Sequence, residues 1–261
     1  EVQAGEYRFA VGSAGSTTLV FQTVYLPLLL AGDKSQLHIE GGTHNGMAPS
    51  FDFVKYAFIP ELKKLGIEID AELTRYGFYP AGGGAWSATI SPSTSLGCYQ
   101  NTVKGEFESV KAVATSAQLP ANVIERELAR VTESLANTEL GLERRQVRSV
   151  GPGNMVSIHA KSAAVCEVFD VVGERGMAAE KVADKAITLF QQYRNSKAVI
   201  GEHLADQLLL PMALGKGGAF TTQEPSLHLR TNAQIIQAFL GVKIGFEKLE
   251  DDCWLVSVGG G

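Results

Sequence analysis

The run Phe78-Tyr79-Pro80-Ala81-Gly82-Gly83-Gly84 separates two stretches with strand patterns, residues 67–75 and 85–91. Glycine and proline at this density predict a tight connection between the two strands. A second dense glycine loop covers residues 41–49. The chain has 28 glycines in 261 residues, about 11%, against roughly 7% in average proteins. Tight turns explain either loop alone, but the two together suggest backbone brought close to a ligand.

Outward from these loops, helix and strand patterns alternate along the chain. Helices are expected at 19–30, 50–66, 122–135, 178–193, 204–214 and 231–240. Strands are expected at 7–11, 37–40, 67–75, 85–91, 104–116, 140–150, 155–160, 166–172, 219–222, 227–229, 242–247 and 253–258. We therefore expect an α/β (α+β) protein made of loosely repeated α/β units, residues 1–101 and 196–261. A more charged, small α/β domain, residues 102–195, is inserted between them.

Charge, cysteine content and hydropathy narrow the class of protein. The formal net charge of −5 excludes a generally basic protein that coats nucleic acid, although a local basic patch remains compatible with it. Cys98, Cys166 and Cys253 are too few and too scattered for a disulfide framework. The longest apolar stretch, residues 23–31, is far shorter than the ~20 residues that span a bilayer. These features predict a cytoplasmic protein without a membrane segment.

The polar candidates for chemistry each have an ordinary structural explanation as well. His228 lies in an expected short strand, where Arg230 would share its face and supply a positive charge. Asp206 and Gln207 begin an expected helix, where an acidic residue is most often a cap. Gln22 lies one turn into a helix with a serine- and glycine-rich start, which could bind an anion. From spacing alone, a structural role for His228 is favoured over a catalytic one.

Common hydrolase patterns are missing from the sequence. None of the five histidines pairs as H-x-x-x-H or H-E-x-x-H, so a zinc protease is not supported. The sequence also lacks the G-x-S-x-G turn that presents a nucleophilic serine. These residues alone therefore indicate an α/β protein with loops suited to phosphate, and no specific reaction.

Several segments, in order along the chain, resemble the RNA 3′-terminal phosphate cyclase family. They are Gly12-Ser13-Ala14-Gly15-Ser16, Glu40-Gly41-Gly42-Thr43-His44-Asn45, Arg75-Tyr76-Gly77-Phe78-Tyr79-Pro80-Ala81-Gly82-Gly83-Gly84, Gly151-Pro152-Gly153-Asn154, Leu204-Ala205-Asp206-Gln207 and His228-Leu229-Arg230-Thr231-Asn232. The resemblance implies repeated α/β units, similar to those of enolpyruvyl shikimate phosphate synthase, with a small inserted domain.

The resemblance also implies an activity. Such an enzyme converts an RNA 3′-phosphate to a 2′,3′-cyclic phosphate while ATP becomes AMP and pyrophosphate. A histidine attacks the ATP α-phosphate, AMP then passes to the RNA 3′-phosphate, and the neighbouring 2′-hydroxyl displaces it. The implied small molecules are ATP and a divalent metal, Mg²⁺ or Mn²⁺, and the implied partner is an RNA 3′ end.

By position, the resemblance assigns roles to six residues. His228 matches the nucleophile, and the ATP-pocket residues match at the positions that follow: Gln22, Pro49, His203, Asp206 and Gln207. In this assignment Pro49 packs on one face of adenine, and His203 takes the place of a stacking ring that is often tyrosine. No metal ligands are assigned.

Two alternatives remain, together with one departure from the family. The family's upstream Glu-Gly-Gly-Gly-Gln segment, with a metal-binding glutamate and phosphate-binding arginines, has no match, so we expect one repeat unit to be missing. A non-catalytic RNA-processing or ribosome-assembly factor on the same fold would bind RNA without forming an adenylate, although His228 argues against it. An enolpyruvyl-transferase-like enzyme is suggested by fold analogy alone.

Overall fold

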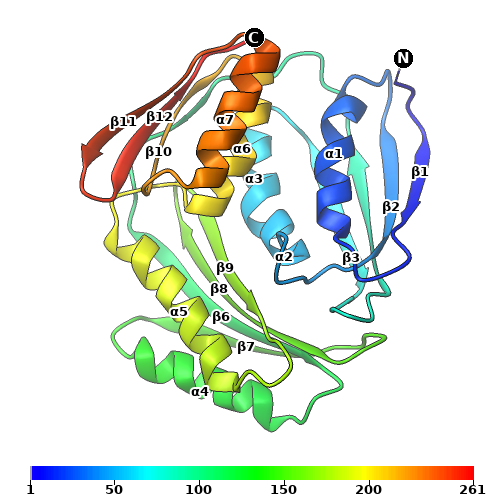
Figure 1. Ribbon diagram of the computed structural model, residues 1–261, viewed down its shortest axis with the longest axis vertical. Coiled ribbons are helices and arrows are strands. Elements are labelled where there is room, and N and C mark those ends of the chain that lie inside the picture. The colour runs from blue at the N-terminus through cyan, green and yellow to red at the C-terminus, as the bar shows by residue number, and fades with distance from the viewer. Residues whose placement is uncertain (1) are drawn as a thin grey trace.

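The computed structural model describes residues 2–261 and arranges them around three four-stranded sheets (Figure 1). Two of the sheets flank a layer of helices, and the third lies with two further helices at one end of the molecule. Among residues 2–261, no helix combines the length and apolar character needed to cross a membrane. The cytoplasmic location stays a prediction.

The first sheet belongs to a continuous segment with the order β-α-β-α-β-β. Its elements are β1 (Glu6–Ala10), α1 (Thr17–Leu29), β2 (Ser35–Gly41), α2 (Phe51–Phe53), the π-helical turn η1 (Val54–Phe58), α3 (Ile59–Lys64), β3 (Ile69–Arg75) and β4 (Gly84–Ile90). The strands lie in the order β1-β2-β4-β3. The pair β1–β2 is parallel, while β4 runs antiparallel to both of its neighbours.

The second sheet repeats this topology. Its elements are β5 (Tyr99–Asn101), α6 (Glu202–Leu214), β10 (Gly218–Thr222), α7 (Leu227–Leu240), β11 (Ile244–Glu250) and β12 (Cys253–Val258). The order β5-β10-β12-β11 matches β1-β2-β4-β3, again with one parallel pair followed by antiparallel ones. The expected repeated α/β units are therefore confirmed. In this correspondence α6 is the counterpart of α1, and α7 is the counterpart of the α2–α3 segment.

The two repeats share one hydrophobic core. Phe21 and Phe51 each place a ring 5.2 Å from the Trp86 ring, between centroids, in edge-on contacts. The Trp86 indole nitrogen donates a 2.8 Å hydrogen bond to the Thr17 hydroxyl. Leu208 of the second repeat is fully buried in the same core. The helices of both repeats are thus packed against one another, and this packing sets the distances between the polar residues that they carry.

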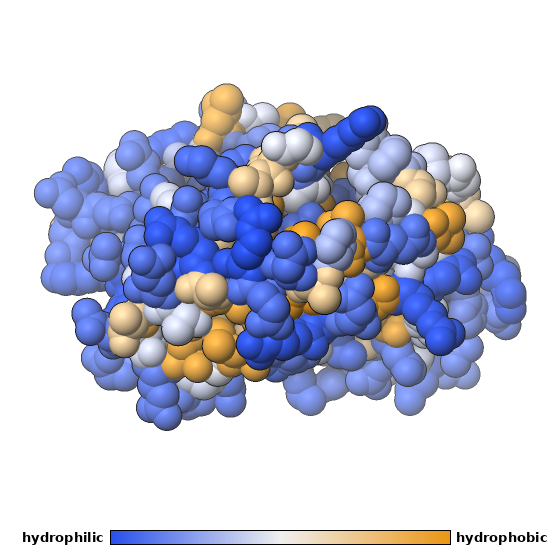
Figure 2. All heavy atoms as spheres, turned by 90° about the horizontal axis from the view of Figure 1, so that it is seen from below, coloured by the Kyte–Doolittle hydropathy of each residue, from blue (hydrophilic) through white to orange (hydrophobic). Residues whose placement is uncertain are grey.

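The third sheet forms within the segment that separates β5 from α6. Its elements are β6 (Phe107–Ala117), α4 (Asn122–Ser134), β7 (Leu140–Gln146), β8 (Gly153–Ser162), β9 (Cys166–Val172) and α5 (Ala179–Asn195). Val131 and Phe190 are fully buried in a separate core between these helices and the sheet. Hydrophilic side chains cover most of this end of the molecule (Figure 2). The domain limits 1–101 with 196–261, and 102–195, stay a prediction.

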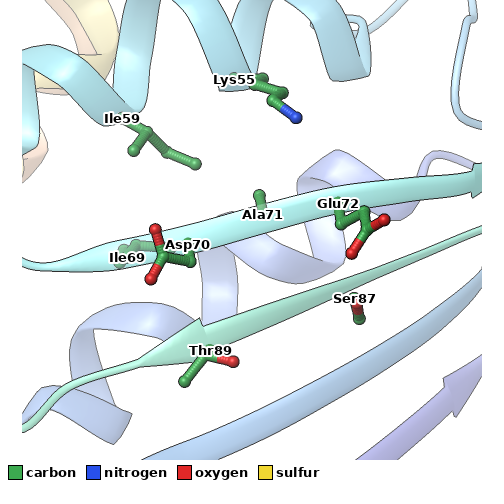
Figure 3. A pocket seen from close by; sticks show the side chains of 8 residues that line it. All are labelled: Lys55, Ile59, Ile69, Asp70, Ala71, Glu72, Ser87 and Thr89. Carbon is green, nitrogen blue, oxygen red and sulfur yellow. The ribbon is translucent and has the colours of Figure 1, made fainter.

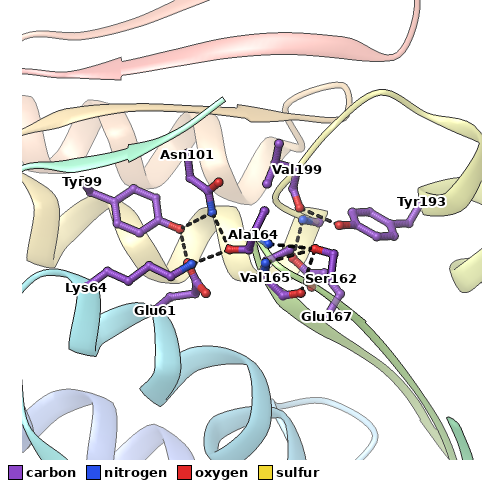
Figure 4. A network of polar contacts seen from close by, with 11 residues as sticks. Glu61, Lys64, Tyr99, Asn101, Ser162, Ala164, Val165, Glu167, Tyr193 and Val199 are labelled. Atoms are coloured by element: carbon purple, nitrogen blue, oxygen red, sulfur yellow. Dashed lines mark hydrogen bonds and ion pairs between the residues drawn. The ribbon is translucent and has the colours of Figure 1, made fainter. Parts of the chain in front are cut away.

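Polar contacts connect the third sheet to the rest of the molecule where the chain passes between them (Figure 4). The Tyr99 hydroxyl donates to Glu61, and Lys64 Nζ lies 2.7 Å from the same carboxylate. Asn101 Nδ2 donates to the Ala164 carbonyl at 3.0 Å. These bonds join α3 of the first repeat, β5 of the second sheet and the turn before β9 of the third sheet.

Lys104 connects the two chain segments that lead into and out of the third sheet. Its ammonium group donates to the carbonyls of Tyr193, at 2.6 Å, and Ser196, at 2.8 Å. The same nitrogen lies 4.1 Å from the centre of the Tyr193 ring. Burial lowers the pKa of the Lys104 ammonium to about 8. The two segments are therefore held side by side by a single side chain.

The structure corrects one expected element that bears on function. Residues 227–229 are not a strand, because α7 begins at Leu227 and continues to Leu240. Ser226 caps the helix by accepting a hydrogen bond from the Leu229 amide. A three-residue apolar stretch cannot distinguish a strand from a helix start, and the capping serine is the signal that decides between them.

Candidate functional site

The site begins where the corresponding helices of the two repeats meet. Gln22 is the sixth residue of α1, and Gln207 is the sixth residue of α6. The amide of Gln22 donates a hydrogen bond to the amide oxygen of Gln207. The two repeats thus place the same residue type at the same helical position, and the two side chains meet between the helices.

Helix α7 brings His228 to the same place. His228 is the second residue of this helix and its side chain is exposed. Asn232 follows one turn later, so it shares the His228 face. Its Nδ2 donates to Asp206 on α6, at 2.9 Å to Oδ1 and 3.1 Å to the main-chain oxygen. This contact links the helix that carries His228 to the helix that carries Asp206.

A pocket of about 410 Å³ lies between these helices. Its polar lining consists of Gln22, Asp206, Gln207, His228, Thr231 and Asn232, and its apolar lining consists of Tyr25, Leu26, Phe58, Leu210, Pro211 and Ile235. The structure therefore brings together four of the six residues chosen from the sequence. Such a mixture of an apolar wall and convergent polar groups is typical of small-molecule sites.

Pro49 and His203 are not part of this lining. Pro49 precedes the first residue of α2 by two positions, and its carbonyl accepts a 2.7 Å hydrogen bond from the Thr18 hydroxyl. His203 is the second residue of α6 and is exposed. Both residues lie at the N-terminal ends of helices that line the pocket or adjoin it.

Arg230 does not act as the expected neighbour of His228. Residues two apart on a helix point in nearly opposite directions. The Arg230 guanidinium carbon lies 5.4 Å from the Phe246 ring centre and 5.3 Å from that of Trp254. Its Nε donates to the Pro225 carbonyl at 3.1 Å. The strand interpretation was wrong here, and Arg230 packs on the sheet instead of facing His228.

Comparison with known proteins decides the family. The chain matches the sequence model for "RNA 3'-terminal phosphate cyclase" over residues 1–246. The chain belongs to this family. It is 43% identical to proteins of that name from Ectopseudomonas mendocina (strain ymp), over 93% of this chain and 71% of the relative, and from Koribacter versatilis (strain Ellin345), over 98% and 72%. A relative of the same name from Pseudomonas fluorescens is also 43% identical, over 96% of this chain and 73% of its own length.

The glycine loops of this cyclase-family chain pack on one another. A Cβ at Gly42 would collide with the Ala14 carbonyl oxygen, and one at Gly82 would collide with the Ser13 carbonyl. A Cβ at Gly153 would collide with the Phe78 ring. The loops from the first sheet therefore meet each other and the start of β8. Close approach of other protein segments accounts for these three glycines.

A buried charged cluster lies at the start of α2, and the sequence analysis missed it. Asp52 is 3% exposed, and its Oδ2 lies 2.7 Å from Arg145 Nη1 of β7. His44, stacked on Tyr76 at 4.9 Å, places its Nε2 3.8 Å from the other carboxylate oxygen. Burial raises the pKa of Asp52, but His44 and the Arg145 guanidinium more than offset this and lower it to about 2.

A repeated sequence pattern could have revealed this cluster's position. Pro49-Ser50-Phe51-Asp52-Phe53 and Pro225-Ser226-Leu227-His228-Leu229 share a Pro-Ser-apolar-polar-apolar order. Both serines cap a helix by accepting from the amide three residues later. Asp52 and His228 therefore occupy equivalent places in the two repeats.

A larger hollow, about 500 Å³, lies at the edge of the first sheet beside β3 (Figure 3). Lys55 and Ile59 border it on the helix side, and Asp70 and Glu72 border it on the strand. It contains none of the residues chosen from the sequence. Its lining carries charges of both signs and does not include His228, so the family resemblance assigns it no role.

Proposed function

We propose that this chain catalyses the ATP-dependent conversion of an RNA 3′-terminal phosphate to a 2′,3′-cyclic phosphate, with His228 as the nucleophile. The observation that carries the proposal is the exposed His228 in a pocket that also holds Gln22, Asp206 and Gln207. Membership of the cyclase family supplies the reaction class. An accessible imidazole in a pocket is what a covalent step requires.

Three displacements at phosphorus make up the proposed reaction. A ring nitrogen of neutral His228 attacks the α-phosphorus of ATP, and pyrophosphate leaves. An oxygen of the RNA 3′-phosphate then attacks the same phosphorus, the bond to the ring nitrogen breaks, and His228 is regenerated. Finally the RNA 2′-hydroxyl attacks the 3′-phosphorus and loses its proton, while AMP leaves. Positioning and charge stabilisation dominate reactions of this type.

The start of α7 favours a phosphate beside His228. The helix has 14 residues and His228 is its second residue, so the imidazole is located within the first turn. Free amide groups and the positive end of the helix dipole at such a position attract anions. The Arg230 guanidinium packs on the Trp254 ring and does not face His228. The start of α7 therefore supplies positive potential close to the His228 imidazole.

The other pocket residues suit a nucleotide. Gln22 and Gln207 can both donate and accept hydrogen bonds, and the Asp206 carboxylate can accept bonds from ribose hydroxyls. We assign Pro49 and His203, at the starts of α2 and α6, to the two faces of adenine. Their separation from the pocket lining makes this the part of the proposal that depends most on the family resemblance.

The proposed metal, Mg²⁺ or Mn²⁺, would accompany the nucleotide. Within residues 2–261, no three His, Cys, Asp or Glu side chains are grouped so that they could hold a metal ion. The residues described therefore do not form a metal site of their own. Magnesium is commonly bound largely by substrate phosphates and water, and it neutralises phosphate charge there.

Labelling with ATP tests the proposal. Incubation with α-labelled ATP and Mg²⁺ or Mn²⁺ should give a protein-bound label that is labile in acid and stable in base, as a phosphoramidate is. His228→Ala should abolish the label. Leu227→Ala, which alters the exposed neighbouring residue, is the matched control and should retain it. An undiminished label on His228→Ala would refute the nucleophile, and RNA binding without any label would favour the non-catalytic alternative.

A further inference from the structure

Asn232 contacts Asp206 in a way that allows only one arrangement of its amide. The carboxylate Oδ1 and the main-chain oxygen of Asp206 are both acceptors, so the group facing them must be the Asn232 NH₂. The distances of 2.9 and 3.1 Å are those of normal hydrogen bonds. One amide group therefore holds both the side chain and the main chain of the same residue.

This contact determines which carboxylate oxygen faces a ligand. Asp206 is the fifth residue of α6, inside the helix, so it is not the helix cap that its sequence context suggested. Oδ1 is bound by Asn232, and among residues 2–261 no side chain or amide donates to Oδ2. Both residues line the pocket. The carboxylate is thus held in one orientation with its second oxygen available.

The same contact also joins two helices that carry the site. Asn232 lies four residues after His228 on α7, and Asp206 lies one residue before Gln207 on α6. A hydrogen bond to a charged group is stronger than one between neutral groups. The bond therefore links α7 to α6, while buried residues of both helices, such as Leu208 and Leu229, pack in the shared core and hold the helices together without it.

We propose that Asn232 is a positioning residue that acts through Asp206: it orients the carboxylate that binds the nucleotide. This inference rests on the proposed function, because the ligand it serves is ATP. Asn232 itself touches neither substrate nor reacting atoms in this assignment. Its loss should weaken ATP binding and leave the intrinsic reactivity of His228 nearly unchanged.

A double-mutant cycle tests the inference. The rate of label formation is measured against ATP concentration for the wild type, Asn232→Ala, Asp206→Ala and the double variant. Asn232→Ala should raise the ATP concentration at half-maximal rate about tenfold and change the maximal rate by less than about threefold, as expected for loss of a charge-assisted bond. In the Asp206→Ala background the same substitution should have almost no further effect.

Controls separate this role from a structural one and from failure of the proposed function. Gln234→Ala changes an exposed residue of the same helix and should behave as the wild type does. Equilibrium binding of ATP to His228→Ala, with and without Asn232→Ala, repeats the comparison without the covalent step. An equal effect of Asn232→Ala in both Asp206 backgrounds, or a loss confined to the maximal rate, would overturn the inference. Absence of label on the wild type would instead refute the proposed function.

Discussion

The starts of α2 and α7 have the same local construction and opposite surroundings. Each follows a proline and a capping serine, and each has its polar residue at the second helical position. In the first repeat that residue is Asp52, which is buried and paired with Arg145. In the second repeat it is His228, which is exposed in a pocket. One helix start thus anchors a neighbouring sheet, while its counterpart is available for chemistry.

The difference comes from what covers each helix. Strand β9 lies against α2, and the Ser50 hydroxyl donates to the half-buried Asp170 carboxylate of that strand. The His228 side chain opens instead onto the pocket. The same helix start therefore carries either a buried ion pair or a solvent-facing side chain, depending on which segment packs over it.

Removing the ion pair between Asp52 and Arg145 should have the largest effect on stability. Asp52→Ala removes one of the two carboxylates paired with Arg145, which is only 17% exposed and keeps Glu143 of β7 as a partner. We expect the free energy of unfolding to fall by about 2–3 kcal/mol, measured by urea titration. Replacing both residues, as Asp52→Leu with Arg145→Met, should cost clearly less than the single change. A double variant as unstable as Asp52→Ala would show that the pair is not the source of the effect.

The ion pair between Asp52 and Arg145 should also make the free energy of unfolding depend on pH in the acid range. The pKa of Asp52 is lowered from 3.8 to about 2 in the folded protein, so its contribution is complete above pH 3.8 and disappears as the pH falls towards 2. The contribution is about 2 kcal/mol. Unfolding curves of the wild type and Asp52→Asn should converge over this window. Curves that stay parallel there would contradict the assigned pKa shift.

Replacing either capping serine should lower the free energy of unfolding by less than Asp52→Ala does, and the two serines should differ from each other. Ser226→Ala removes one helix cap and should cost about 1 kcal/mol. Ser50→Ala removes a cap and also the hydroxyl that donates to half-buried Asp170, so it should cost more. Urea titration of both variants gives the comparison. Equal losses would mean that the bond between Ser50 and Asp170 adds nothing to stability.

His228→Ala should have the smallest effect on stability although we expect it to abolish the label. The side chain is exposed and makes no hydrogen bond to residues 2–261, so the unfolding free energy should change by no more than about 0.5 kcal/mol. A large loss of stability would indicate that this histidine, like Asp52, has a structural role.

Helices and strands whose apolar residues recur with a regular period were predictable from the sequence. The amphipathic segments expected at 122–135 and 178–193 correspond to α4 and α5, and the last expected strand has the limits of β12. Short segments were not predictable in the same way. β5 has three residues and was missed, and the start of α7 was taken for a strand because so few residues show no period.

Site residues were predictable where residue type and family resemblance agreed. Contacts between residues far apart in the sequence were not predictable. The meeting of Gln22 with Gln207 joins residues 185 positions apart, and that of Asp52 with Arg145 joins residues 93 apart. No local pattern specifies such pairs. The glycine loops show the same limit, because their density indicated a close approach of backbone without telling whether the neighbour is a ligand or another loop.

The hydrogen bonds from Lys104 to Tyr193 and Ser196 affect the entropy cost of pairing β5 with β10 in the second repeat. β5 must pair with β10 across the whole segment from Asn101 to Gly218. Closing a flexible loop of that length costs chain entropy before any contact is gained. When the third sheet has folded, Lys104 joins the chain segments that lead into and out of it. Only the chain outside these two segments then remains to be closed for β5 to pair with β10. Folding of the inserted segment thus offsets part of the entropy loss that its length adds to forming the repeat that carries His228.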